Sequence, residues 1–91
     1  MEPLRPLVGV GALIFRDRRI LLGKRKNAHG EGEYASPGGH LEHMESFEAC
    51  LKREAREEVG IEIDNVRFLC VSNLKAHAPK HYVGVSLLAD W

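Results

Sequence analysis

The stretch GGHLEHMESFEACLKREAREEVGI, residues 38–61, constrains the fold more than any other part of the sequence. Within it, Ser46 is a good N-cap residue, and Glu48 carries a negative charge suited to the first turn of a helix. Gly60 suits the position just after a helix, because glycine adopts the left-handed backbone conformation without strain. These signals together predict a helix over residues 47–59.

The charges of this predicted helix separate into two groups when its residues are placed about 100° apart around an axis. Lys52 and Arg56 lie on the side expected to face solvent. Glu54 and Glu58 fall within about 20° of Phe47, in the middle of the apolar face. A carboxylate that points toward the body of a domain needs a partner: a proton, a cationic side chain or a bound cation.

Glu54 and Glu58 are also spaced so that both can reach one bound ion, since one helical turn separates them by about 6 Å. Like charges at this spacing repel, and a divalent cation would reverse that repulsion. Ligands that are all oxygen suit Mg²⁺ or Mn²⁺ better than zinc. The simpler alternative for a charged helix is a solvated surface. Arg53 and Glu57 are either a weak surface ion pair or a pair in which Arg53 orients a carboxylate.

The whole chain of 91 residues predicts one small domain with a modest core. Thirteen basic and thirteen acidic residues give a net charge of zero, so neither a nucleic acid nor a membrane is an expected partner. The apolar run at residues 7–15 is too short to span a membrane, and no targeting signal frames it. We therefore expect a cytoplasmic protein.

The two cysteines, Cys50 and Cys70, each lie among apolar residues and lack the spacing of a metal-binding or redox pair. Both are predicted to be buried free thiols, and a single disulfide is the alternative.

The order of predicted elements is that of a mixed α/β or α+β domain. A strand at 7–15, a turn at 16–18 and a returning strand at 19–25 form a hairpin. A polar loop at 26–33, a short strand ending at Pro37, a loop after Gly38–Gly39, the helix, and strands at 65–74 and 81–91 complete the order. Because a second long amphipathic helix is not predicted, the chain is either a fragment or completed by another subunit.

Gly39, Glu45 and the run REAREEVGI at 53–61 resemble the Nudix box, G-x5-E-x7-R-E-U-x-E-E-x-G-U. Every fixed polar and glycine position is met, and only Ala55 departs mildly, standing where a larger aliphatic residue is typical. The resemblance implies a single Nudix domain over 1–91, with the box at 39–61. The implied fold is an α/β/α sandwich around a mixed sheet, truncated at its C-terminus.

The same resemblance implies hydrolysis of a nucleoside diphosphate linked to another group, with Mg²⁺ or alternatively Mn²⁺ as cofactor. By position in the motif, three carboxylates would bind metal, and the Gly38 carbonyl would be a further ligand. Arg53 would orient one of the carboxylates, Glu45 would brace the loop, and Glu54 would act as general base. The three carboxylates are those of Glu54, Glu57 and Glu58.

The segments VGVG, LLGKRK, PGGHLE and HYV are similar to MutT-type nucleoside-triphosphate diphosphatases, particularly those acting on purine and thiopurine deoxynucleotides. The implied products are a nucleoside monophosphate and pyrophosphate. Arg25, with Lys24, would reach the phosphates, although a solvated strand end explains these residues equally well. The residues that would line the nucleoside pocket are Gly39, His40, Tyr82 and Gly84, and plain strand packing is the alternative for His81 and Tyr82.

Two other kinds of function stay open at this point. Within the same chemistry, the substrate could be ADP-ribose, a dinucleotide or a cytidine nucleotide. In another class, the chain could be a non-catalytic module that binds a nucleotide or a partner. An exposed final strand and an open sheet face would also favour a homodimer.

Overall fold

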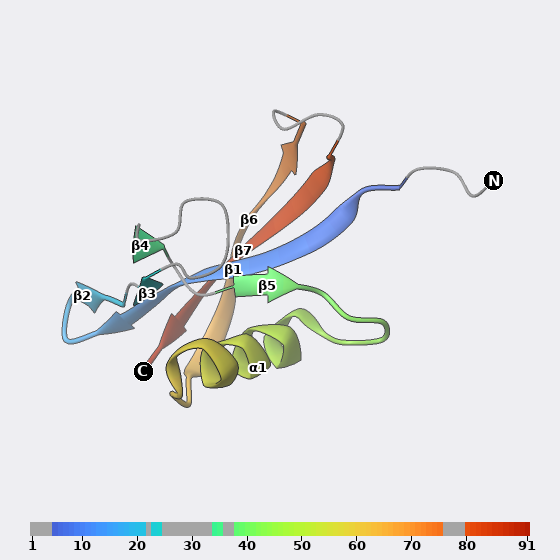
Figure 1. Ribbon diagram of the computed structural model, residues 1–91. Helices are drawn as coiled ribbons and strands as arrows, with labels where there is room; N and C mark the ends of the chain where they lie inside the picture. The colour runs from blue at the N-terminus through green and yellow to red at the C-terminus, as the bar shows by residue number, and fades with distance from the viewer. Residues whose placement is uncertain (1–4, 22, 25–33, 36–37, 76–79) are drawn as a thin grey trace.

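The computed structural model describes residues 5–21, 23–24, 34–35, 38–75 and 80–91. Figure 1 shows one helix beside a sheet of long, twisted strands. In chain order, the elements are β1 (Leu7–Arg16), β2 (Arg19–Ile20), β3 (Gly23–Lys24), β4 (Tyr34–Ala35), β5 (Gly38–His40), α1 (Phe47–Val59), β6 (Asp64–Leu74) and β7 (Tyr82–Asp90).

The sheet is mixed, as the sequence predicts, and β1 is its central strand. The strand β1 pairs in parallel with β7 along its length, and β7 pairs antiparallel with β6. On its other edge β1 pairs antiparallel with β2 at one end and with β5 near its start. Strands β3 and β4 form a separate two-stranded sheet.

The predicted turn between the first two strands is present, at Asp17 and Arg18. Both residues have positive φ angles, 49° and 65°, as expected for a tight hairpin turn whose twist matches its strands. The single returning strand predicted at 19–25 is wrong, because β2 ends at Ile20 and β3 belongs to the other sheet. Apolar periodicity does not show where a strand leaves one sheet for another.

The loop predicted after Gly38–Gly39 is also wrong at its start, since residues 38–40 form the strand β5. Gly38 lies opposite Gly11 of β1. A Cβ atom on Gly38 would lie 2.5 Å from the carbonyl oxygen of Val10 and 2.9 Å from the Gly11 Cα. The glycine therefore lets β5 approach β1 closely, a use of glycine that a turn-propensity reading misses.

The helix α1 begins and ends where the sequence predicts. The Ser46 hydroxyl oxygen accepts a hydrogen bond of 3.0 Å from the Ala49 N–H, which satisfies one free donor of the first turn. Gly60 has a φ of 68°, and its N–H donates to the Arg56 carbonyl at 3.0 Å.

The core lies between α1 and the face of the sheet that α1 covers. Every second residue of β1 and β7 points into it, and the parallel register places Val10 beside Val85 and Ile14 beside Ala89. The buried apolar residues are Val10, Ala12, Ile14, Cys50, Leu51, Ala55, Ile63, Val85, Leu87 and Ala89. Within the residues that the structure describes, no second helix lies on the opposite face.

Two burial predictions are wrong, each for its own reason. Cys70 is exposed, whereas Cys50 is buried as predicted, and both are free thiols. Cys70 lies on β6 opposite Ser86, on the face that no described helix covers. Phe47 is 43% exposed, because α1 meets the sheet through Cys50, Leu51 and Ala55. The described residues also include no helix that is long and apolar enough to cross a membrane.

Candidate functional site

Arg53 joins the loop before α1 to the acidic face of the helix. Its Nε and one terminal nitrogen donate to the two carboxylate oxygens of Glu45, at 2.8 and 3.0 Å. The other terminal nitrogen donates to Glu54 at 2.7 Å. Arg53 also donates to the His40 carbonyl at 3.2 Å, and these four hydrogen bonds, with two longer ones to Glu57 and the Cys50 Sγ, fix this partly buried guanidinium.

The pairing with Arg53 keeps Glu45 ionised. The guanidinium hydrogen bonds lower the pKa of Glu45 to about 2, and the same bonds raise the pKa of Arg53. Glu45 also accepts a hydrogen bond of 3.1 Å from the Glu42 N–H. These contacts are what a residue that braces the loop would make, as the sequence predicts for Glu45.

The carboxylate of Glu54 lies directly against Gly39. A Cβ atom on Gly39 would overlap the carboxyl carbon and both oxygens of Glu54. The Glu54 carboxylate therefore lies against the backbone of β5, in a space that only glycine leaves free. The Glu54 side chain is only 15% exposed, so it points toward the body of the domain as the helical wheel predicts.

Glu58, one turn later, lies beside Glu54. Its Oε1 accepts a hydrogen bond of 3.3 Å from the Gly38 N–H. The residue as a whole is exposed, but its carboxyl group meets β5 and Glu54. Loss of solvent around that group, together with a hydrogen bond to Glu54 and repulsion by Glu54 and Glu57, raises the pKa of Glu58 to about 7. Glu58 therefore holds a proton more readily than an ordinary glutamate does.

The third predicted carboxylate, Glu57, is not in this pair. Its side chain is 60% exposed and lies 3.4 Å from an Arg53 nitrogen. Among the described residues, no group of three or more His, Cys, Asp or Glu side chains could hold a metal ion by itself. The Glu54–Glu58 pair still fits Mg²⁺, which proteins commonly bind through one or two carboxylates and the phosphates of a substrate.

A shallow hollow of about 410 Å³ borders β5, the strand against which the acidic pair of Glu54 and Glu58 lies. One wall is formed by His40 and Tyr82, whose rings stack with 5.7 Å between centroids and 21° between planes. Gly39 borders both the hollow and Glu54, so the two features share one strand. The residues that line the hollow are Gly9, Val10, Gly11, Gly39, His40, Leu74, Tyr82 and Gly84.

The structure thus brings together most of the residues proposed from the sequence. Arg25 lies outside the described residues, and Lys24 is described only by its backbone pairing with Tyr34. His81 contacts Asn73 of β6 through its ring, which agrees with plain strand packing for this residue. The sequence prediction missed Leu74 as a lining residue, since its position depends on the register between β6 and β7.

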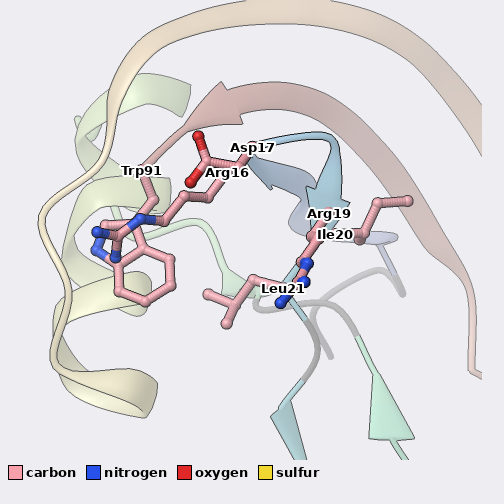
Figure 2. A pocket seen from close by; sticks show the side chains of 6 residues that line it. All are labelled: Arg16, Asp17, Arg19, Ile20, Leu21 and Trp91. Atoms are coloured by element: carbon pink, nitrogen blue, oxygen red, sulfur yellow. The ribbon is translucent and has the colours of Figure 1, made fainter.

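A second hollow, of about 490 Å³, contains none of the residues proposed for the site. It lies at the turn between β1 and β2 and is lined by Arg16, Asp17, Arg19, Ile20, Leu21 and Trp91. Figure 2 shows the Arg16 side chain extending over the Trp91 ring, with its guanidinium carbon 4.5 Å from the ring centroid. This contact is a cation–π pair. It joins the last residue of β1 to the residue that follows β7, the parallel neighbour of β1.

The model of the NUDIX domain family matches residues 5–90, nearly the whole chain. The chain belongs to the NUDIX family. A crystal structure of a MutT NUDIX hydrolase from Burkholderia pseudomallei shares the fold with a TM-score of 0.84 and 40% identity, covering 97% of this chain and 69% of that one. The fold predicted from the box is therefore confirmed.

Two curated relatives carry named activities. The ADP-ribose pyrophosphatase of Methanocaldococcus jannaschii is 45% identical over 58 residues, which are 64% of this chain and 34% of the relative. The oxidized purine nucleoside triphosphate hydrolase of Mus musculus is 35% identical over 78 residues, which are 86% of this chain and 46% of the relative. The chain thus spans a third to about half of the length of these relatives.

Proposed function

We propose that this protein hydrolyses the diphosphate linkage of a nucleotide, with Mg²⁺ as cofactor, and that its substrate is a nucleoside triphosphate cleaved to the monophosphate and pyrophosphate. The observation that carries the proposal is the Glu54–Glu58 pair, which lies on the bare backbone of Gly38 and Gly39. A divalent cation would relieve the repulsion between two acids placed against each other, and enzymes of the NUDIX family generally use a divalent metal. Mn²⁺ is the alternative ion.

In this proposal, Glu54 and Glu58 hold the ion, and Glu57 and the Gly38 carbonyl are further ligands. A divalent ion bound there supplies positive charge that neutralises the pyrophosphate. Hydrolysis forms a bond from a water oxygen to phosphorus and breaks the phosphoanhydride bond. Glu54 accepts the proton of that water, and Arg53, 2.7 Å away, keeps Glu54 in position.

The nucleoside lies in the hollow beside β5, and its phosphates extend across Gly39 toward the acidic pair. Gly39 borders both features, which supports this placement. His40 and Tyr82 contact the nucleoside, and Lys24 and Arg25 are proposed to contact the phosphates.

A second candidate substrate is ADP-ribose, since the relative of 45% identity is an ADP-ribose pyrophosphatase. The proposed acidic pair and the proposed chemistry are the same for both substrates, because each contains a diphosphate linked to a nucleoside. The two candidates differ in which group leaves, so the products of hydrolysis distinguish them.

The test is the variant Glu58→Gln, assayed with Mg²⁺ on nucleoside triphosphates and ADP-ribose. We expect product formation to fall at least about 100-fold, because losing a metal ligand costs no less than losing a group that supports one. Glu62→Gln is the matched control, since Glu62 is an exposed acid of the same type, paired with Arg56 at 2.9 Å. Equal activity of wild type and Glu58→Gln would contradict the proposal.

A further inference from the structure

The hollow at the turn between β1 and β2 lies apart from the proposed metal site. The strand β5, against which the acidic pair lies, meets β1 at residues 9–11. Arg16, at the edge of the hollow, lies five residues beyond Gly11, about 16 Å along an extended strand. The hollow also shares no lining residue with the one beside β5. We call it the turn hollow.

Two arginines border the turn hollow and oppose each other across the hairpin. Arg16 is the direct partner of Arg19 in the antiparallel pairing of β1 with β2. Side chains of directly opposed residues project from the same face of a sheet, and like charges in that arrangement repel. None of the ion pairs formed among the described residues includes either arginine. A bound anion would replace this repulsion with two attractions.

The turn as a whole carries an excess of positive charge. Residues 16–19 are three arginines and one aspartate, so their net charge is +2 in a chain whose total is zero. Asp17 borders the turn hollow, and its single carboxylate offsets only one of the two guanidinium charges there. The local field therefore attracts anions, although the whole chain does not.

The two guanidinium groups are directed to different parts of the turn hollow. Trp91 restrains the first, because the guanidinium carbon of Arg16 lies 4.5 Å from the centroid of its ring. Figure 2 shows the Arg19 side chain extending away from Trp91, toward Leu21. Guanidinium groups that stand apart suit an anion with two charged groups better than a single small one. Phosphate groups fit this arrangement, since arginine binds each of them through paired hydrogen bonds.

We propose that the turn hollow is a second ligand site of this protein, which binds a diphosphate group between Arg16 and Arg19. Its volume of about 490 Å³ lies within the range of small-molecule pockets. Free pyrophosphate and nucleoside diphosphates both contain this group, and the experiment distinguishes the two sources. The inference does not rest on the proposed function, because no step of that function uses these arginines.

The test is a titration with inorganic pyrophosphate in EDTA at constant ionic strength. Without a divalent ion the acidic pair repels phosphates, and constant ionic strength excludes general screening. Isothermal titration calorimetry measures the affinity. Fluorescence reports the location, because Trp91 is the only tryptophan of the chain. A parallel titration with ADP identifies the source: tighter binding of ADP assigns the site to a nucleotide, and tighter binding of pyrophosphate assigns it to the free anion.

Arg19→Gln is the direct variant, and Arg18→Gln is its matched control. Arg18 is the neighbouring arginine of the same turn and does not line the turn hollow. We expect wild type to show saturable binding with a change in Trp91 emission. Arg19→Gln should weaken binding at least about fivefold, whereas Arg18→Gln should change it by less than about twofold.

The thermal midpoint without ligand separates binding from folding. Arg19→Gln should not lower it, because the substitution removes a like-charge pair. Should Arg19→Gln fail to fold, Arg16→Gln replaces it in calorimetry and should weaken binding by a similar factor. The inference would be overturned by any of three results: no saturable binding to wild type, binding without a Trp91 response, or equal affinities of the Arg19→Gln and Arg18→Gln variants.

Discussion

At Gly39 a hydrogen atom stands where other residues carry a side chain, and the Glu54 carboxylate lies in the space that results. The N–H of the neighbouring Gly38 donates a hydrogen bond to the Glu58 carboxylate. Gly39 therefore lets the Glu54 carboxylate lie on backbone, whereas Gly38 lets β5 approach β1 and so places the N–H that Glu58 accepts from. At the scale of single residues, the site depends as much on these glycines as on the acids.

Arg53→Lys should damage the site although it conserves the charge. Lysine has three donors on one atom and cannot reproduce the fork that reaches Glu45, Glu54 and the His40 carbonyl together. We expect hydrolysis to fall by about 10–100-fold, the usual cost of removing a group that orients metal ligands. Steady-state kinetics on the best substrate measures the change.

Arg56→Lys is the control for that variant. Arg56 lies three residues further along the same helix and pairs with Glu62 on the exposed surface. Exposed pairs contribute little, so stability and activity should both be nearly unchanged. If both substitutions had the same effect on activity, Arg53 would not be a positioning residue.

At the scale of elements, the caps of α1 stabilise the helix that carries Arg53, Glu54 and Glu58. Ser46→Ala removes the acceptor for the Ala49 N–H and should destabilise the protein by about 1 kcal/mol. For a domain of this size that corresponds to a fall of about 4–8 °C in thermal midpoint. Differential scanning calorimetry measures this change in thermal midpoint.

Two variants serve as controls for Ser46→Ala. Ser46→Asp should keep most of the stability, and Ser72→Ala on β6 should have little effect. A Ser46→Ala midpoint equal to wild type would show that the cap contributes nothing.

The helix was predictable from the sequence because its signals are local. The cap residues and the spacing of Leu51 and Ala55 all lie within one stretch. The strand β5 and the break between β2 and β3 were not predictable, because each depends on pairing with a strand distant in sequence. The exposure of Cys70 depends on which face of the sheet α1 covers, and the exposure of Phe47 depends on which residues of α1 meet the sheet.

At the scale of the whole molecule, the acidic pair should make stability depend on pH and on metal. The pKa of Glu58 is raised from 4.5 to about 7 in the folded state, so the folded protein holds its proton more tightly than the unfolded chain. Stability from this group is therefore present below pH 4.5 and lost as pH rises through 7. Because Glu58 is partly solvated, we expect a loss of about 1 kcal/mol.

Millimolar Mg²⁺ should reverse that loss at pH 8, by raising the thermal midpoint of wild type through binding to the folded state alone. At pH 5 the effect should be much smaller, because the proton competes with the ion. Glu58→Gln should show neither the loss nor the response to Mg²⁺, and Glu62→Gln should show both. A midpoint that Mg²⁺ leaves unchanged at pH 8 would contradict the assignment of the Glu54–Glu58 pair.

The open face and the outer edge of the sheet are surfaces at which the whole molecule could pair with a second copy. Among the described residues, β6 has no neighbour on its outer edge and exposes several apolar side chains. These are Phe68, Leu69, Val71 and Leu74. The homodimer expected from the sequence stays a prediction, which the solution mass of the protein will test.

The sequence by itself determined the family, the helix with both its ends, and the inward direction of Glu54, because fixed spacing and helical periodicity encode all three. Only the tertiary structure decided that Gly39 makes room for Glu54, that Glu57 lies apart from the acidic pair, and that Gly9, Gly84 and Leu74 meet at one hollow. These facts depend on register between strands far apart in the chain, and register is set by packing of the whole sheet.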